Sequence, residues 1–273
     1  MLSGKLATLL SGRYIEIKML PLSFKEYNEL KGGNVKENFN KYFINGGFPY
    51  TTKLEDDDVM REYIEGIYNT VIIKDIITRK KITDVSLLKS VTKFISNSIG
   101  NMLSSKKIAD YLTSSGRKTS HVTIDNYIEA LIESFIVYSV DRYDIRGKQL
   151  LKSLNKYYLV DVGFRKIILG DKRIDVGFVL ENIVYLELLR RGYKVYIGKI
   201  NELEIDFIAE NGIDKIYFQV SATVLDPNTF AREIAPLEKI NGNYPKYIIT
   251  MDELPFNKDG IKQINIIDFL LND

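Results

Sequence analysis

The sequence of 273 residues contains no cysteine and no tryptophan, and it has a single histidine, His121. The absence of cysteine excludes disulfides and thiolate sites for zinc or catalysis, and it fits a reducing compartment such as the cytoplasm. A lone histidine cannot build a zinc site, and its place at the start of an expected helix favours a surface or capping role. No apolar run approaches the roughly 20 residues that span a bilayer, and the amino terminus lacks a cleavable signal pattern. We therefore expect a soluble, cytoplasmic protein that does not contact a membrane.

Neither sign of charge is in large excess. The 38 Lys and Arg residues nearly balance the 36 Asp and Glu residues, which leaves a net charge of +2. Such a balance provides no general attraction for nucleic acid, so any DNA-binding surface has to be local. The hydrophobic content of 45% is ordinary for a globular protein. The length exceeds the usual size of one domain and predicts two or three compact units.

The first two units are predicted from helical spacing and turn residues. The start of the chain predicts a short helix, a strand at 14–18, a proline turn and a second helix, for which Ser23 and Glu26 have capping-box spacing. Apolar residues at helical spacing follow over 61–77. Three further helices are expected, then a strand, a basic tip and a returning strand, in the order typical of a winged helix. These five elements are placed at 87–100, 104–116, 119–135, 135–143 and 156–161.

The last part of the chain predicts a three-layer α/β arrangement. A long apolar helix at 176–193 is followed by three strand-like runs, a helix at 226–241 and a strand at 244–251. With linkers near 81–86 and 161–177, the fold class is an α+β or α/β multidomain protein. Its expected units are residues 1–83, 84–161 and 162–273.

The hairpin EIDFIAENGIDKIYFQVS, residues 204–221, has the shape of half a nuclease site. Glu204 and Asp206 share one face of the first strand, and Gln219 and Ser221 share one face of the second. Metal-dependent nucleases often place Asp on the first strand and Glu-x-Lys on the second. That chemistry needs two or three acidic ligands for Mg²⁺ and often a lysine that positions or activates water.

Several stretches resemble, in the same order, the C-terminal region of a group of prokaryotic AAA-like (Walker-type) ATPases. They are LATLLSGRYIEIKMLPLSFKEY (6–27), GGFPY (46–50), IYNTVIIKDIITRKKI (67–82), KYYLVDVGFRKIILG (156–170) and GFVLENIVYLELLRRGYKVYI (177–197). In that group an ATPase core is followed by a helical lid, a winged helix and a C-terminal domain of unknown function that is similar to restriction endonucleases. The resemblance implies an ATPase remnant with a lid over 1–83, a winged helix over 84–161 and a restriction-endonuclease-like domain over 162–273.

A phosphate-binding loop is missing from this sequence. Such a loop needs a glycine-rich turn with Gly-Lys-Ser/Thr opening a helix. Ser3-Gly4-Lys5-Leu6 is too short and lacks the hydroxyl, and Arg13 is expected to act as a structural anchor. The resemblance therefore implies that the chain begins after the Walker motifs and does not hydrolyse ATP alone.

The resemblance also aligns Glu181, Asp206, Gln219 and Ser221 with the acid, acid, acid and lysine of PD-(D/E)XK nucleases. Gln219 cannot supply the charge that draws Mg²⁺ from water, and Ser221 cannot replace a cation, although Lys215 on the same hairpin offers a replacement. We expect a degenerate site without a cofactor. Two alternatives stay open. One is a Mg²⁺-dependent nuclease with Asp206 as a metal ligand, and the other is a plain hairpin whose acids face solvent.

Basic residues collect in the expected winged helix. Residues 100–156 hold nine basic and six acidic residues, a net charge of +3, where a DNA-binding module would place them. The expected tip carries Arg142, Arg146, Lys148, Lys152 and Lys156. The candidate recognition helix begins with Arg117, Lys118 and Ser120, but Asp125, Glu129 and Glu133 follow, as a protein-binding module would allow.

We interpret the sequence as a non-catalytic C-terminal part of an AAA-like ATPase that recognises DNA or a protein partner, with self-association as a further possibility. The alternative from a different class is a Mg²⁺-dependent nuclease. Whether the chain has any enzymatic activity stays open at this point.

Overall fold

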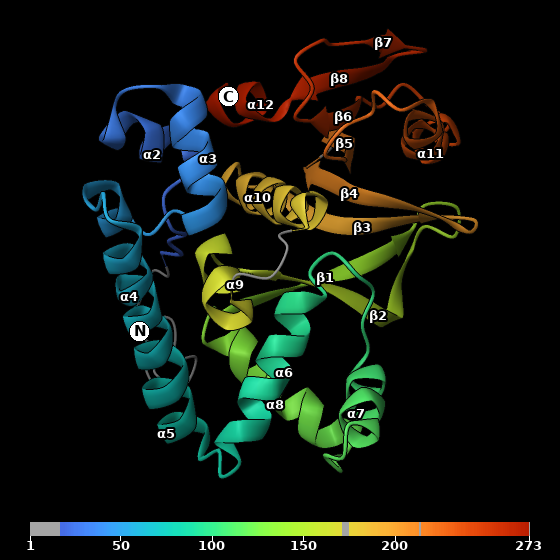
Figure 1. The fold of residues 1–273 in the computed structure, drawn as a ribbon. Helices are drawn as coiled ribbons and strands as arrows, with labels where there is room; N and C mark the ends of the chain where they lie inside the picture. The colour runs from blue at the N-terminus through green and yellow to red at the C-terminus, as the bar shows by residue number, and fades with distance from the viewer. Residues whose placement is uncertain (1–16, 171–174, 213, 273) are drawn as a thin grey trace.

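Helices form the first part of the chain and a mixed sheet dominates the last part, which confirms a mixed α/β structure (Figure 1). The computed structural model describes residues 17–170, 175–212 and 214–272, apart from the side chains at 71–73 and 152–153. The helix and most of the strand predicted before residue 19, with positions 3–6 and Arg13, lie outside the described residues.

The amino-terminal helices begin and end at the residues that the sequence marks as caps. Ser23 and Glu26 form the predicted capping box, in which Glu26 Oε2 accepts the Ser23 N–H at 2.7 Å. Gly46 ends the second helix with a positive φ of 77°, which a residue with a side chain rarely adopts. These helices are α2 (Phe24–Lys31), α3 (Val35–Asn45), η1 (Pro49–Lys53), α4 (Asp57–Tyr68), the π-helical η2 (Asn69–Ile76) and α5 (Ile77–Lys80).

Three helices and a hairpin follow in the predicted order. They are α6 (Val85–Asn97), α7 (Ser105–Ser114), α8 (His121–Glu133), β1 (Val137–Asp144) and β2 (Gln149–Leu159). The side chains of Asp84, Ser104 and Ser120 accept backbone N–H groups at the three helix starts. These caps explain why the helices begin close to where the sequence predicts.

Two predicted boundaries are wrong. The returning strand β2 begins at Gln149 instead of 156, because the expected tip pairs with the end of β1. The expected linker over 161–177 contains helix α9 (Val162–Leu169), which Asp161 caps. Val162 and Phe164 of this helix are buried, so the segment belongs to the packed core.

One eight-stranded sheet runs through the described part of the chain in the order β2-β1-β3-β4-β5-β6-β8-β7. Its remaining strands are β3 (Lys194–Ile200), β4 (Leu203–Asn211), β5 (Asp214–Val220), β6 (Lys246–Thr250), β7 (Asn257–Lys258) and β8 (Ile261–Asn265). Arg142–Asp144 of β1 pair in parallel with Ile197–Lys199 of β3. The hairpin after α8 therefore extends the C-terminal sheet, and the units expected over 84–161 and 162–273 share it.

Helices cover both faces of the C-terminal strands. The three helices are α10 (Val176–Arg190), α11 (Pro227–Glu238) and α12 (Ile266–Leu271). Buried residues of α10 and α12 form one core with Phe207 and Phe218, while Ile234 and Leu237 of α11 lie in a second core with other strand residues. This places the sheet between two helical layers, as the sequence predicts.

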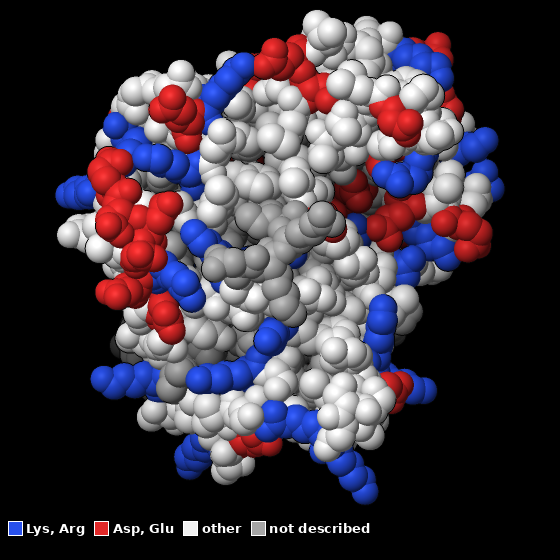
Figure 2. All heavy atoms as spheres, in the orientation of Figure 1, with Lys and Arg blue, Asp and Glu red and all other residues white. Residues whose placement is uncertain are grey.

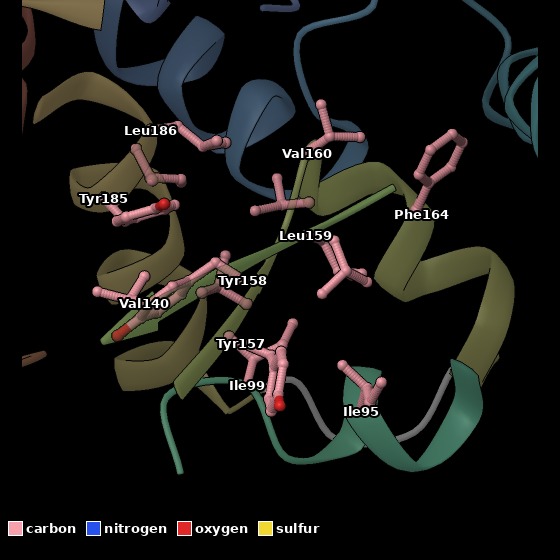
Figure 3. Close-up of a cluster of buried hydrophobic side chains, with 14 of the residues drawn as sticks. Ile95, Ile99, Val140, Tyr157, Tyr158, Leu159, Val160, Phe164, Tyr185 and Leu186 are labelled. Atoms are coloured by element: carbon pink, nitrogen blue, oxygen red, sulfur yellow. The ribbon is translucent and has the colours of Figure 1, made fainter. Parts of the chain in front are cut away.

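The larger core joins the hairpin, α6, α9 and α10 (Figure 3). Tyr158 of β2 stacks on Tyr185 of α10 with ring centroids 4.5 Å apart. Both side chains are almost fully buried, so aromatic packing holds the hairpin against the long helix.

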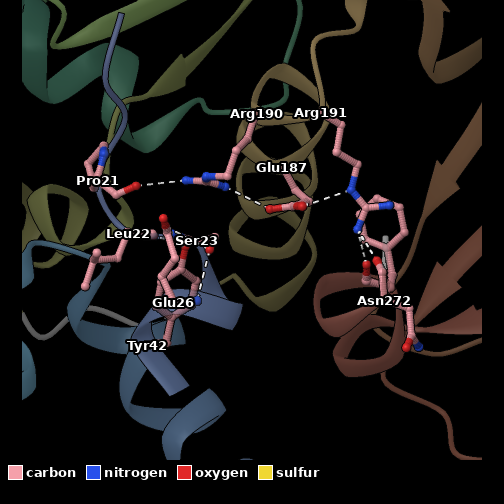
Figure 4. Close-up of polar contacts among 10 residues, drawn as sticks. Pro21, Leu22, Ser23, Glu26, Tyr42, Glu187, Arg190, Arg191 and Asn272 are labelled. Carbon is pink, nitrogen blue, oxygen red and sulfur yellow. Dashed lines mark hydrogen bonds and ion pairs between the residues drawn. The ribbon is translucent and has the colours of Figure 1, made fainter. Parts of the chain in front are cut away.

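The end of α10 holds segments from both ends of the described chain (Figure 4). Glu187 is buried and accepts from Arg190 at 2.8 Å and from Arg191 at 2.9 Å. Arg190 also donates to the Pro21 carbonyl, and Arg191 donates to the Asn272 carbonyl. In the described residues, no helix has the length and apolar character needed to cross a membrane.

Candidate functional site

A buried lysine lies at the centre of the acidic cluster. Lys156 Nζ is 2.8 Å from Glu181 Oε1, 2.6 Å from Glu204 Oε1 and 3.4 Å from Asp206 Oδ1. The Tyr158 hydroxyl donates to the same Glu181 oxygen at 2.5 Å. The side chain of Lys156 is only 2% exposed, whereas Glu204 is 40% exposed and marks the open edge of the cluster. We call these five residues the Lys156 cluster.

Three elements position the Lys156 cluster. Lys156 and Tyr158 are two residues apart on β2, so both side chains point to the face that α10 covers. Glu181 lies in the fully buried middle of α10. In β4, a register shift places one extra residue between the pairs Tyr196–Ile208 and Gly198–Ile205. Such a bulge changes the direction of side chains at the edge of a site, and Asp206 lies within it.

The backbone of Gly100 closes the other side of Glu181. Gly100 has a positive φ of 74°, and a Cβ atom there would lie 2.6 Å from Glu181 Oε2. The turn after α6 and strand β2 therefore both lie against Glu181, so the helix–hairpin unit, from α6 to β2 (85–159), packs on two sides of this carboxylate.

Burial and an excess of negative charge decide the protonation of the cluster. The pKa of Glu181 is raised to about 7, chiefly by burial, with Lys156 acting to lower it and Asp206 acting to raise it. Burial alone would lower the pKa of Lys156, but Glu181, Asp206 and Glu204 together raise it above its ordinary value. Lys156 is therefore an ammonium at neutral pH, and with three acids to one cation the cluster keeps negative charge. Burial and Glu181 also raise the pKa of Tyr158, which therefore stays a hydrogen-bond donor.

The remaining polar atoms of the nuclease-like positions already have protein partners. Asp206 Oδ2 accepts the Val220 N–H at 2.9 Å, and Gln219 Oε1 accepts the Asp206 N–H at 2.8 Å. Gln219 Nε2 donates to Glu233 Oε2 of α11 at 3.1 Å, in a buried position. Gln219 is thus a bridge between β4 and α11, and its amide cannot also serve a metal ion without losing these bonds.

The structure brings Glu181, Asp206 and Gln219 together, because Lys156 contacts both acids and Gln219 accepts the Asp206 N–H. Ser221 is buried directly after β5 but donates to the Thr223 carbonyl, so it does not reach the cluster. The proposal that Lys215 replaces the missing lysine is wrong. Its ammonium pairs with Glu210 at 2.6 Å and lies over the Tyr143 ring. The plain solvent-facing hairpin is wrong as well, because Asp206 is only 15% exposed and both acids pair with Lys156.

Lys156 itself was assigned to the basic tip, and this assignment is wrong. The residue is fully buried and pairs with three acids, so it offers no charge to a ligand on the surface. The sequence pattern also gave no indication of Tyr158 in the cluster or of Glu233 as the partner of Gln219. One signal for Lys156 was present, since a lysine at the start of the apolar strand KYYLV shares a face with Tyr158.

The Lys156 cluster does not fit Mg²⁺ as it stands. A divalent ion needs carboxylate oxygens that are turned toward a common point, and here the lysine ammonium lies at that point. Among the described residues, no group of three or more His, Cys, Asp or Glu side chains is arranged to hold a metal ion. Asp206, the expected metal ligand of the nuclease alternative, is one of the three acids that pair with the lysine.

The candidate DNA-contacting residues are divided between anchored and exposed positions. Arg117 donates to Ser90 at 2.9 Å and pairs with Asp84 at 3.0 Å, so it fastens the α7–α8 loop to α6. Ser120 caps α8 by accepting the Thr123 N–H. Lys118 is exposed.

The hairpin tip is similarly divided. Arg146 and Lys148 are exposed, whereas Arg142 is half-buried on β1. The side chain of Lys152 lies outside the described residues. The exposed charge of the tip is therefore smaller than the sequence suggests, because Lys156 faces inward and Arg142 is partly enclosed.

Comparison with known proteins identifies similar chains without an assigned activity. The family model described as "Domain of unknown function (DUF8612)" matches residues 36–174. An "Uncharacterized protein" of Haemophilus influenzae is 40% identical over 277 residues, which cover 99% of this chain and 68% of the relative. "Uncharacterized protein MJ1544" of Methanocaldococcus jannaschii is 28% identical over 284 residues, which cover 98% of this chain and 63% of that relative. No solved structure matches the chain significantly.

Proposed function

The chain belongs to the family of the domain of unknown function DUF8612, whose description names no activity, and from its own geometry we propose a non-catalytic role in recognising DNA. In this proposal the chain is the C-terminal part of an AAA-like ATPase and carries a winged helix and a restriction-endonuclease-like domain. These two units select the partner on which the ATPase acts. The chain spans only about two thirds of the length of the relatives it matches, which leaves room for an ATPase core in those proteins.

One observation carries the non-catalytic part of the proposal, namely the position of Lys156 between three carboxylates. An ammonium at that point provides the positive charge that a metal ion would otherwise provide. Removing the ion pair would leave buried charges without a partner, which costs several kcal/mol. The cluster is therefore best explained as a structural junction that fixes the helix–hairpin unit on the C-terminal sheet.

The arrangement of elements supports the two proposed domain likenesses. Three capped helices and a hairpin follow one another over 85–159, which is the order of a winged helix. The C-terminal strands lie between α10 and α11, and contacts through Lys156 and the Asp206 N–H link Glu181, Asp206 and Gln219, which supports the nuclease likeness. The substitution of the third acid by Gln219 supports descent from such a site with loss of its chemistry.

DNA is favoured over a protein partner by the charge of the middle unit. Residues 100–156 have a net charge of +3, although this figure includes the buried Lys156. The exposed Lys118 before α8 is placed to contact phosphates, and the exposed Arg146 and Lys148 at the hairpin tip add positive charge to the same unit. Contacts of this kind depend strongly on salt and little on sequence.

Binding of a short DNA duplex, measured by fluorescence anisotropy from about 50 mM to about 200 mM salt, tests the proposal. We expect measurable affinity at low salt and a steep loss as salt increases. The same duplex, incubated with Mg²⁺ or Mn²⁺, is expected to stay intact. Absence of binding at low salt would contradict DNA recognition and would leave recognition of a protein partner as the remaining form of the proposal.

A Mg²⁺-dependent nuclease is the second candidate, and one observation favours it. Lys156 brings a lysine to the acids although position 221 has none, and such a lysine can position or activate water. This candidate requires that substrate and metal move the ammonium away from Glu181. Cutting that depends on Mg²⁺ or Mn²⁺ and disappears in Asp206→Asn would establish it and overturn the non-catalytic proposal.

A further inference from the structure

The exposed side of α8 does not suit insertion into a DNA groove. Asp125, Glu129 and Glu133 are all exposed and are four residues apart, so they form an acidic stripe along one side of this helix. Glu133 pairs with Lys80 at 2.6 Å, while neither Asp125 nor Glu129 forms an ion pair with another described residue. DNA phosphates on either side of a groove would be repelled by this stripe.

A neighbouring surface has the opposite charge. On α6, Lys89 and Lys93 are exposed and one turn apart, and on α7 Lys106 and Lys107 are exposed in the first turn. We call this surface, together with Lys118 and Tyr111, the α6–α7 face. Its exposed acids are Asp84, which pairs with Arg117, and Asp110.

Two contacts make the α6–α7 face continuous. The Phe94 ring of α6 and the Tyr111 ring of α7 lie 4.8 Å apart between centroids, so the two helices present their lysines on adjoining surfaces. Arg117 donates to Ser90 of α6, which brings the adjacent Lys118 to the same side. Tyr111 is 55% exposed, so an aromatic ring lies among the lysines, as in surfaces that bind single strands by stacking.

The charge of this region is larger than that of the hairpin tip. Residues 77–120 contain nine basic and two acidic residues, a net charge of +7, so the rest of the chain has a net charge of −5. Figure 2 shows the separation on one face of the molecule. Blue side chains are spread over the lower part, where α5 to α8 lie in Figure 1, and red side chains follow α4 on the left.

We propose that the α6–α7 face, and not the groove-facing side of α8, is the surface that contacts the phosphate backbone of nucleic acid. The inference rests on the proposed function, because it assigns the surface for DNA recognition. Lysines that converge on a backbone without a reading helix predict binding that is largely independent of sequence. The helix–hairpin unit would then lie on DNA by its α6 and α7 side, with α8 turned away.

The test compares two sets of substitutions in the full chain, each of which replaces positively charged side chains by uncharged Gln. Lys89→Gln, Lys93→Gln and Lys107→Gln, combined, are expected to weaken duplex binding at least about tenfold and to reduce the salt slope by about 3, close to one unit for each lost phosphate contact. The matched control, Arg146→Gln with Lys148→Gln at the hairpin tip, is expected to change affinity less than about threefold. Melting curves check that both proteins are folded.

A second measurement needs no variant. The lysines of the wild-type protein are acetylated chemically with and without DNA duplex, and mass spectrometry gives the extent of acetylation at each lysine. We expect DNA to protect Lys89, Lys93 and Lys107 and to leave Lys148 reactive. Binding that survives the triple variant, or protection confined to the hairpin tip, overturns the α6–α7 face while the proposed function stands. Absence of any binding by the unmodified protein at low salt removes the proposed function itself, and the inference with it.

Discussion

Lys156 of β2 and Glu181 of α10 form a buried ion pair, with Nζ and Oε1 2.8 Å apart. The pair connects the hairpin that follows α8 with the long helix of the C-terminal layer. Glu204 and Asp206 add β4 to the same contact. Since β1 and β3 also pair in the sheet, the helix–hairpin unit and the C-terminal strands are joined by both backbone and charge. We therefore expect these parts of the chain to unfold together.

Replacement of Lys156 by Met tests whether the cluster is structural. Removing the cation leaves buried carboxylates without a partner, so the free energy of unfolding should fall by about 3–5 kcal/mol. The loss should be smaller near pH 5 than near pH 8, because Glu181, whose pKa is already raised to about 7, becomes neutral in acid. Urea denaturation at both pH values measures this. Lys148→Met at the exposed tip is the control and should change stability by less than about 0.5 kcal/mol. An equally stable Lys156→Met protein would contradict the structural role.

Gly100 provides a separate test of the space around Glu181. Gly100 and Gly116 both have a positive φ, of 74° and 84°, but only at Gly100 would a Cβ atom meet Glu181 Oε2, at 2.6 Å. Ala at either position should cost about 1–2 kcal/mol for the backbone conformation. Gly100→Ala should cost about 1–3 kcal/mol more, because the site is already filled. Thermal melting of the two variants gives the difference, and equal losses would mean that Glu181 is not packed against this backbone.

The buried Asp161 carboxyl group should make the stability of the fold depend on pH. The carboxylate is buried and accepts the N–H groups of Gly47 and Gly163, and no cation pairs with it in the described structure. Burial raises its pKa to about 7, although both hydrogen bonds lower it. A carboxyl whose pKa is higher in the folded chain stabilises the fold fully below its unfolded pKa and loses this contribution as pH rises through 7. Each unit of difference corresponds to about 1.4 kcal/mol.

The melting temperature should therefore fall between about pH 5 and about pH 8, and Asp161→Asn should make this decline shallower. Part of the decline should remain in the variant, because the pKa of Glu181 is raised in the same direction. Asp226→Asn serves as the control. Asp226 is an exposed helix cap, and the hydrogen bonds from Thr229 lower its pKa. Its contribution to stability therefore changes only in acid. Above about pH 5 the melting temperature of Asp226→Asn should follow pH in parallel with that of the wild-type protein. A profile that Asp161→Asn leaves unchanged would show that Asp161 is ionised throughout this range.

Much of the element order was predictable because caps and periodicity are local. Ser23, Ser104 and Ser120 mark helix starts that the structure confirms. The convergence of Glu181 with Asp206 was predictable only through resemblance, since it joins a helix to a distant strand. The position of Lys156 was not predicted, because its charge suggested exposure and its partners lie 25 to 50 positions away in the chain. The pairing of β1 with β3 was missed for the same reason, since no local pattern determines which strands become neighbours.

We expect this chain neither to bind nor to hydrolyse ATP. The 273 residues contain no Gly-Lys-Ser/Thr loop that would hold the phosphates at a helix start. Addition of Mg²⁺ and ATP should therefore cause no thermal shift and no phosphate release above background. Micromolar affinity in a calorimetric titration would contradict this and would require a phosphate site of another kind.

Gln219 offers a direct comparison of the non-catalytic proposal with the nuclease alternative. Its amide oxygen accepts the Asp206 N–H, and its amide nitrogen donates to Glu233 at 3.1 Å in a buried position. Gln219→Glu restores the acid of the nuclease motif but removes the donor and places two carboxylates against each other. We expect a loss of about 2–3 kcal/mol, the usual cost of a buried charged group without its hydrogen bond.

The double variant Gln219→Glu with Glu233→Gln exchanges donor and acceptor and keeps the shape of both side chains. Because Gln at position 233 can donate to Glu at position 219, we expect it to recover most of the lost stability, as measured by urea denaturation. Addition of millimolar Mg²⁺ should not raise the melting temperature of Gln219→Glu, since Lys156 still lies between the other acids. The nuclease alternative expects the opposite, because a third carboxylate would strengthen a metal site. A melting temperature that increases with Mg²⁺ in Gln219→Glu, together with cutting of DNA, would show that the Lys156 cluster opens to a metal ion.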